Sequence, residues 1–211
     1  MQTEVSYNHE IEVYFAKEAE RCQGLAWLHN KASEQFSTSN TYLALPIIVL
    51  STLSGAVSSA SANLFSDAKI ASMSVGALSI FIGVLGTFQS YFGHAKRSEA
   101  HRITGLMYAK LNQFLGVELT LKRKERILAK DLLKMVREQS ERLLETGPPV
   151  PQNIIDRFKS EFVAKYPNVA IPDMANGLRS VFINDKEDDI LIPPPPPEII
   201  VQTKLTSAII D

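Results

Sequence analysis

Few side chains in this sequence have the types and spacing that a reaction centre or a metal site requires. The chain has one cysteine, Cys22, and four scattered histidines, which leaves little material for a zinc site. His94 and His101 are seven residues apart, whereas a two-ligand clamp on one helix needs a spacing of about one turn. The sequence also lacks a phosphate-binding Gly-Lys-Ser/Thr loop and a nucleophile elbow. We therefore expect no enzyme, no metal and no cofactor, with His94 and His101 as interfacial or helix-packing side chains and Cys22 buried as a small apolar side chain.

The other group with binding chemistry is a basic cluster in a chain that is close to neutral. The 211 residues carry a net charge of −1, but residues 94–146 hold twelve basic and seven acidic side chains. Such a cluster can bind lipid phosphates, nucleic acid or an acidic protein surface, or it can be a solvated helix face. Without interleaved aromatic residues, sequence-specific binding of nucleic acid is not expected. The cluster consists of Lys122, Arg123, Lys124, Arg126 and Lys130.

Two tracts without any charged side chain stand out from the rest of the chain. A helix needs about 20 mainly apolar residues to cross the ~30 Å hydrocarbon layer of a bilayer. Thr41–Leu64 and Ile70–Tyr91 both meet that length. We predict two transmembrane helices that are antiparallel because the connection is short; a soluble hairpin buried in a large core is the alternative. The charge-free tracts lie between Glu34 and Asp67 and between Lys69 and Lys96.

Small residues line one face of each tract. In the second tract they follow a 4-3-4-3 spacing, which is a seven-residue repeat that keeps them on one side of a helix. Helices in lipid associate through close packing and interhelical hydrogen bonds, and small side chains permit both. We therefore expect these faces to close the hairpin. They consist of Ser51, Ser54, Gly55 and Ser58 in the first tract and of Ser72, Gly76, Ser79, Gly83, Gly86 and Ser90 in the second.

The charges that flank the tracts predict an orientation in the membrane. Basic residues near transmembrane ends favour the cytoplasmic side. The outer flanks carry six of them, against Lys69 alone in the connecting turn, so both termini are expected on the cytoplasmic side. The six are Arg21, Lys31, Lys96, Arg97, Arg102 and Lys110.

Amphipathic helices are predicted on both sides of the hairpin. Residues 8–37 place apolar side chains from Ile11 to Phe36 at helical spacing. A second helix is predicted from His94 to Glu145, with an apolar stripe whose mixed spacing is typical of helix-on-helix packing. Because the hairpin returns the chain to its starting side, we expect these helices to form a coiled pair, with the last third of the longer one free for another partner. The stripe consists of Ile103, Met107, Leu111, Phe114, Leu121, Leu128, Leu132, Met135 and Leu143.

The composition changes at Gly147-Pro148-Pro149, where we predict a stiff linker. Short helices are expected over residues 152–166 and 173–182, followed by a polyproline II segment. The β-branched end of the chain suits an added strand on the sheet edge of a neighbour, so we expect it to dock on partners. The docking residues are Pro193, Pro197, Ile199, Ile200, Val201 and Leu205. The predicted organisation is residues 1–40, 41–93, 94–146 and 147–211.

Parts of the sequence resemble the SLATT group of two-transmembrane proteins. The resemblance rests on Trp27-Leu-His-Asn-Lys-Ala with Phe36, on the run from Leu45-Pro46-Ile47 to Gly55, and on a second span followed by a long basic helix. It covers residues 10–145. It implies a virion membrane or minor capsid protein, because similar members occur in large double-stranded DNA viruses. Bacterial relatives, associated with nucleotide-signalled defence, imply a membrane-disrupting or pore-forming effector instead.

Taken together, the sequence predicts an all-α membrane protein. A two-helix transmembrane hairpin is continued by a long cytoplasmic-side coiled pair and an extended Pro-rich tail. The expected function is a structural anchor that links the internal membrane of a DNA virus particle to its capsid shell. The expected partners are the lipid bilayer, other capsid or membrane proteins and a second copy of the chain. Two alternatives remain open, namely an oligomeric channel or membrane-permeabilising effector and a soluble or peripheral coiled-coil adaptor.

Overall fold

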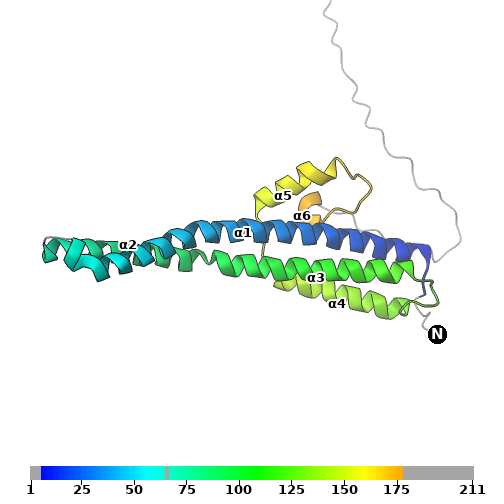
Figure 1. The fold of residues 1–211 in the computed structure, drawn as a ribbon. Coiled ribbons are helices and arrows are strands. Elements are labelled where there is room, and N and C mark those ends of the chain that lie inside the picture. Colours follow the sequence, from blue (N-terminus) through cyan, green and yellow to red (C-terminus); the bar gives the residue numbers. More distant parts are fainter. Residues whose placement is uncertain (1–5, 65–66, 178–211) are drawn as a thin grey trace, which may run out of the picture. The chain divides into compact units, whose positions relative to one another are not determined.

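The structure is a computed structural model that describes residues 6–64 and 67–177 (Figure 1). Every regular element in these residues is helical, which confirms the predicted all-α class. The long elements are α1 (His9–Leu64), α2 (Ala68–Phe92), α3 (His94–Thr120) and α4 (Ala129–Thr146). The short ones are α5 (Gln152–Phe158), the π-helical turn η1 (Lys159–Val163) and α6 (Asp173–Asn176).

Helix α1 runs without interruption from the amphipathic segment into the first apolar tract. Its start is fixed by Asn8, whose side-chain oxygen accepts the backbone N–H of Ile11 at 2.8 Å. The helix continues through Pro46, which removes one backbone donor but does not end the helix here. The predicted boundary near residue 41 is therefore not a break in secondary structure. One 56-residue helix contains both the amphipathic segment and the first apolar tract.

Helices α2 and α3 follow α1 in the opposite direction, and both pack against it (Figure 1). Asp67 caps the start of α2, because its carboxylate accepts the N–H of Lys69 at 2.8 Å. Gly93 separates α2 from α3 and has φ = +58°, a left-handed conformation that glycine adopts without steric cost. The two apolar tracts thus pair as an antiparallel helical hairpin, as predicted.

The single helix predicted from His94 to Glu145 is wrong. Helix α3 ends at Thr120, and α4 begins at Ala129 and returns along α3 (Figure 1). The guanidinium group of Arg126 donates hydrogen bonds to the carbonyl oxygens of Leu119 and Leu121, each at 2.9 Å. These bonds satisfy carbonyls that a helix end leaves without partners. The last third of the predicted helix is consequently packed and not free for another partner.

The core confirms the apolar stripe of α1 and corrects the stripe of α3. Four residues of the predicted stripe are exposed instead, namely Ile103, Met107, Leu128 and Met135, at 45%, 44%, 65% and 40%. The buried face of α3 instead contains residues of mixed type, including His101, Thr104 and Gly105. Polar and small residues on that face hid it from a pattern based on large apolar side chains. The core consists of Phe15, Ala19, Cys22, Leu25, Ala26, Leu28, Tyr108, Leu111, Leu115, Leu132, Val136, Leu143, Ile154, Ile155, Phe158 and Ala175.

Residues 147–177, here called the strap, pack on α1. A helix was predicted over residues 152–166, and α5 and η1 confirm its first twelve residues. Pro172 is fully buried against Gly24, where an added Cβ would lie 2.6 Å from the Pro172 ring. Helix α6 covers residues 173–176 of the second short helix, which was predicted over residues 173–182, and residues 178–182 lie outside the described residues. We call residues 6–40 and 94–177 the helical head, and residues 41–64 and 67–92 the hairpin.

Candidate functional site

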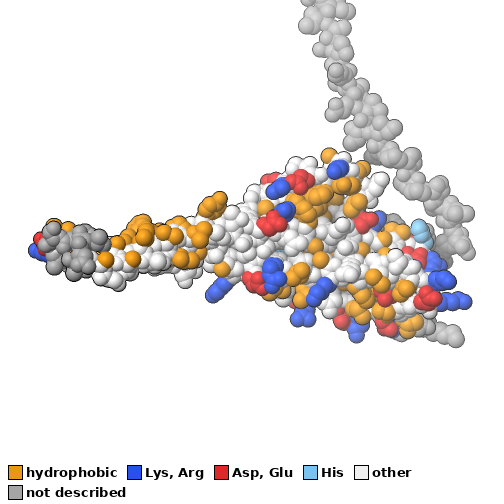
Figure 2. Space-filling view, viewed as in Figure 1, with side chains coloured by type: hydrophobic (Ala, Val, Ile, Leu, Met, Phe, Trp, Pro, Cys, Tyr) orange, Lys and Arg blue, Asp and Glu red, His pale blue; other side chains and the backbone are white. Residues whose placement is uncertain are grey.

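The hairpin exposes apolar side chains that the chain itself does not cover. Two helices are long and apolar enough to cross a membrane by length and composition, and only 6% of each apolar window is buried. Tyr42, Ile80 and Tyr91 are 76%, 72% and 82% exposed, whereas Phe15 and Leu115 in the head are fully buried. Figure 2 shows charged side chains gathered over the head, with apolar and uncharged surface along most of the hairpin. The hairpin is therefore the part of the described chain in which long apolar helices are left mostly exposed.

The seam between the two hairpin helices differs from the predicted one. The least exposed residues of α2 recur at heptad spacing, and most are large and aliphatic. These residues fill the seam. Each small residue of the predicted face directly follows a seam residue in the sequence, so its side chain points to the side of the seam and not into it. The seam of α2 consists of Ala71, Val75, Leu78, Ile82, Leu85 and Gln89, and that of α1 of Leu43, Ile47, Leu50, Ser54 and Val57.

The predicted small-residue faces therefore do not close the hairpin. Ser54 is buried at the seam and Gly86 is half-buried, but the others face outward. A Cβ added at any of the four hairpin glycines would meet nothing within 4 Å. Two heptad rows run side by side on α2, and spacing alone does not distinguish which row faces α1. The outward residues are Ser51, Gly55, Ser58, Ser72, Gly76, Ser79, Gly83 and Ser90.

Several hydroxyl groups of the hairpin satisfy themselves within their own helix. Ser59 donates to the carbonyl of Gly55 at 3.0 Å, Ser79 to that of Val75 at 2.8 Å, and Thr87 to that of Gly83 at 2.9 Å. A polar side chain that already has a partner costs much less to place in an apolar medium. These hydroxyls are therefore compatible with a hydrocarbon environment.

A column of stacked rings joins α1 to α3 within the head. Nδ1 of His29 and Nδ1 of His101 are 3.0 Å apart in a buried hydrogen bond. Phe36 stacks on His101 with ring centroids 5.4 Å apart and on His94 at 5.9 Å, while Tyr108 stacks on His29 at 5.7 Å. His94 and His101 thus pack between helices, which is one of the two roles expected for them. The sequence did not reveal His29 as the partner of His101. The position of His29 within the apolar stripe of α1 was the available signal.

Burial sets the protonation of this histidine pair. Burial, with a smaller contribution from His101, lowers the pKa of His29 to about 4, and burial also lowers the pKa of His101. Both rings are therefore neutral at pH 7, so that one Nδ1 donates and the other accepts.

A buried carboxylate links α1 to α4. Glu18 accepts hydrogen bonds from Arg21 at 2.6 and 2.8 Å and from the hydroxyl of Ser140 at 2.8 Å. Cys22 is fully buried beside it, which confirms the expectation from sequence. Burial, followed by the charge of Glu18, raises the pKa of the Cys22 thiol to about 12. The thiol is therefore protonated and unreactive in the folded protein.

The basic cluster lies in the loop between α3 and α4, with Lys130 in the first turn of α4. Arg123 and Arg126 both pair with Glu12, at 2.6 and 2.7 Å, and these pairs hold the loop on α1. Lys122, Lys124 and Lys130 are exposed and have no such structural role in the described residues. Glu12 precedes Thr41 by 29 residues on one helix, which corresponds to about 44 Å. The loop is thus several Debye lengths from the hairpin.

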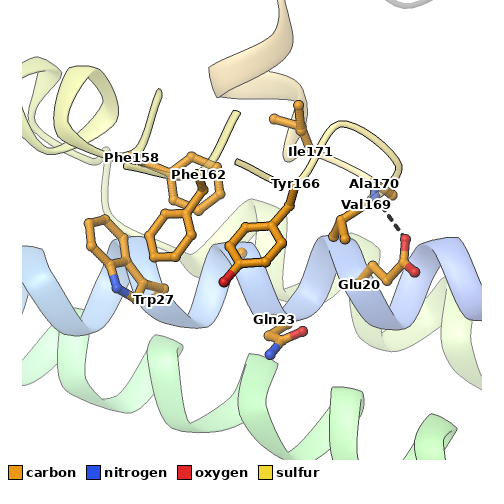
Figure 3. A pocket seen from close by; sticks show the side chains of 10 residues that line it. Glu20, Gln23, Trp27, Phe158, Phe162, Tyr166, Val169, Ala170 and Ile171 are labelled. Carbon is orange, nitrogen blue, oxygen red and sulfur yellow. Dashed lines mark hydrogen bonds between the residues drawn. The ribbon is translucent and has the colours of Figure 1, made fainter. Parts of the chain in front are cut away.

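A groove of about 390 Å³ lies between α1 and the strap (Figure 3). Aromatic rings line one end, where the ring centroids of Trp27 and Phe162 are 5.1 Å apart. At the other end, Glu20 accepts the backbone N–H of Ala170 at 2.7 Å. No sequence pattern indicates this groove, because it forms only when the strap folds back on α1. It is lined by Glu20, Gln23, Gly24, Trp27, Phe158, Phe162, Tyr166, Val169, Ala170 and Ile171.

Comparisons of the chain with protein-family models, curated proteins and solved structures find no match. The resemblance to the SLATT group therefore stays a prediction. The predicted docking residues of the tail, from Pro193 to Leu205, lie outside the described residues.

Proposed function

We propose that this protein is a membrane-anchored structural protein whose hairpin lies in a lipid bilayer and whose helical head lies on one side of it. The observation that carries the proposal is the contrast in exposure between the two parts. The hairpin presents side chains such as Ile80 and Phe81 outward, at 72% and 53% exposure, while the head buries a normal apolar core. Lipid is the environment in which such an uncharged, outward-facing apolar surface is stable.

The proposed orientation places both flanks of the hairpin on the cytoplasmic side. The six basic residues near the outer ends, against Lys69 in the turn, support this orientation. From Thr41 to His9, α1 extends 32 residues, so the head reaches about 48 Å from the membrane boundary. This reach is shorter than a straight helix ending at Glu145 implies, because α4 folds back along α3.

In its finer form, the proposal is that the protein links the internal membrane of a DNA virus particle to the capsid shell. The resemblance to the SLATT group supports this form, and the reach of the head suits a spacer between two layers. The head and the tail would contact neighbouring capsid or membrane proteins. Since the basic loop is about 44 Å from the hairpin along α1, Lys122 and Lys124 would face a protein or a second surface and not the lipid that holds the hairpin.

The second candidate function is the oligomeric channel or membrane-permeabilising effector. The outward position of the small residues on α2 favours it, because small faces allow helices from several copies to pack closely. The internal hydrogen bonds of Ser79 and Thr87 favour the structural role, since these hydroxyls need no water-filled pore. Release of a trapped dye from liposomes by the purified protein supports the channel, and liposomes that stay sealed support the anchor.

Carbonate extraction tests the anchor directly. Membranes that contain the full chain are washed at alkaline pH, which removes peripheral proteins, and are then pelleted. We expect the protein in the pellet. A variant with Ile80→Lys and Val84→Lys places two charges on the exposed face of α2, each costing about 2.5–3.5 kcal/mol at mid-membrane, and we expect it to be released.

A matched control carries the same two lysines on exposed apolar positions of the head, at Val117 and Leu128. We expect this control to stay in the pellet. Release of the unaltered chain into the supernatant would contradict the anchor and favour a soluble or peripheral adaptor.

A further inference from the structure

The groove between α1 and the strap has an apolar end and a charged end on the same helix face. Trp27 and Glu20 are seven residues apart on α1, which separates them by about 10 Å along the helix axis. In Figure 3, Phe162 and Tyr166 lie between these two residues, and Glu20 lies beside Val169 and Ala170. A molecule that fills the groove therefore contacts aromatic rings at one end and a carboxylate at the other.

The aromatic end offers ring surfaces that attract cations. Trp27 meets Phe162 at an interplanar angle of 80°, and Phe162 stacks on Tyr166 with centroids 6.2 Å apart. The face of such a ring carries partial negative charge and binds an ammonium group within about 6 Å. The amino group of Lys165, which is not one of the groove-lining residues, lies 5.4 Å from the centroid of the Tyr166 ring.

The charged end is fixed in place and open to a ligand. One oxygen of Glu20 accepts the backbone N–H of Ala170 at 2.7 Å, so the carboxylate is held at the wall of the groove. Within residues 6–64 and 67–177, no basic side chain forms an ion pair with Glu20. A carboxylate in this position repels an anion and attracts a cation.

We propose that this groove binds a small organic cation, an ammonium compound with an apolar body about 10 Å long. The ammonium group lies at Glu20, and the apolar body packs on the rings of Trp27, Phe162 and Tyr166. The groove volume of about 390 Å³ suits a ligand of this size. This inference goes beyond the proposed anchor, and neither depends on the other.

The experiment uses the fluorescence of Trp27, the only tryptophan in the chain. The full chain in maltoside micelles, which carry no charge, is titrated with 4-phenylbutyltrimethylammonium. We expect a saturable change in Trp27 emission. The variant Glu20→Gln keeps an oxygen that can accept the N–H of Ala170 but removes the charge, and we expect it to bind this cation about tenfold more weakly.

Matched controls separate charge recognition from simple filling of an apolar space. Glu34→Gln removes one negative charge from α1 outside the groove, and we expect it to bind like the unaltered chain. The neutral 4-phenylbutanol should show the same affinity for the unaltered chain and for Glu20→Gln. Tetramethylammonium, which lacks the apolar body, should bind at least tenfold more weakly than the phenylbutyl compound.

Two further results complete the test. Tyr166→Leu alters a residue that is 45% exposed, so it should fold, and we expect it to weaken binding of the cation severalfold. The absence of any saturable change in Trp27 emission would overturn the proposal. Equal affinity of Glu20→Gln and the unaltered chain for the cation would also overturn it, because the groove would then be an apolar space without charge selectivity.

Discussion

Acidification should loosen the head through its buried histidine pair. The pKa of His29 is lowered to about 4 in the folded protein, against 6.5 for an ordinary histidine. The unfolded chain therefore binds a proton that the folded chain does not, at every pH between these two values. Stability from this group is complete above pH 6.5 and is lost as the pH falls toward 4.

The magnitude follows from the same values. At pH 5 the solution is about 1.5 pH units below the pKa of the unfolded histidine, and each unit corresponds to about 1.36 kcal/mol. His29 alone should therefore cost about 2 kcal/mol of unfolding free energy between pH 7 and pH 5. His101 acts in the same direction, because its pKa is also lowered. One charged group touches the column at Phe36, where the guanidinium of Arg97 lies 5.9 Å from the centroid of the ring.

Thermal unfolding followed by circular dichroism measures this loss on the full chain in detergent. For a chain of this size, 2 kcal/mol corresponds to a decrease in melting temperature of roughly 4–8 °C from pH 7 to pH 5. The double variant His29→Phe with His101→Phe keeps both rings in the column and removes both titrating groups, so its decrease should be less than half as large. His9→Gln is the control at an exposed histidine and should behave like the unaltered chain.

Stopping at pH 5 avoids the carboxylates of the α1–loop contact. Glu12, which two arginine side chains hold, has a pKa lowered to about 2, so its contribution is lost only below pH 4.5. A melting temperature that does not change between pH 7 and pH 5 would refute the reasoning. An equal decrease in the double variant would refute it as well, because the loss would then arise elsewhere.

Three further predictions concern the packing of the head. Arg126→Met removes buried charge-assisted hydrogen bonds and should lower the free energy of unfolding, measured by denaturant titration, by about 1.5–3 kcal/mol. The control Arg123→Met alters an exposed side chain and should lower it by less than about 1 kcal/mol. Gly24→Leu forces a side chain into the Pro172 ring, so the strap should detach and residues 164–171 should be cut faster by a protease; unchanged cleavage would contradict the packing described. Cys22 should react with a maleimide only after unfolding, since its thiol is buried and protonated at neutral pH. Rapid labelling of the native chain would show that α1 is not packed as described.

The sequence was sufficient for the features that depend on composition and on regular spacing. The stripe from Phe15 to His29 identified the buried face of α1, because large apolar residues at helical spacing have one way to leave water. The charge-free tracts identified the hairpin helices by length and composition. These features need no information about the neighbours of a residue.

Features that depend on long-range contacts could not be predicted in the same way. The break after Thr120 is stabilised by Arg126 and by Glu12, which is more than a hundred residues away in sequence. The seam of α2 has two heptad rows as candidates, and the choice depends on how the side chains of α1 fill the space. The groove requires the strap to fold back, and the pairing of His29 with His101 requires the register between α1 and α3.

The central claim, that the hairpin lies in lipid, can be tested by measuring the depth of a single site. In a chain with Cys22→Ser, a spin label at Ile80→Cys reports on the middle of α2, and one at Lys122→Cys reports on the exposed loop of the head. After reconstitution in liposomes, we predict that the label at residue 80 is relaxed more strongly by oxygen, which dissolves in hydrocarbon, than by a water-soluble nickel complex. The label at residue 122 should show the opposite order. Stronger relaxation by the nickel complex at residue 80 would mean that the hairpin is in water, and it would contradict the account.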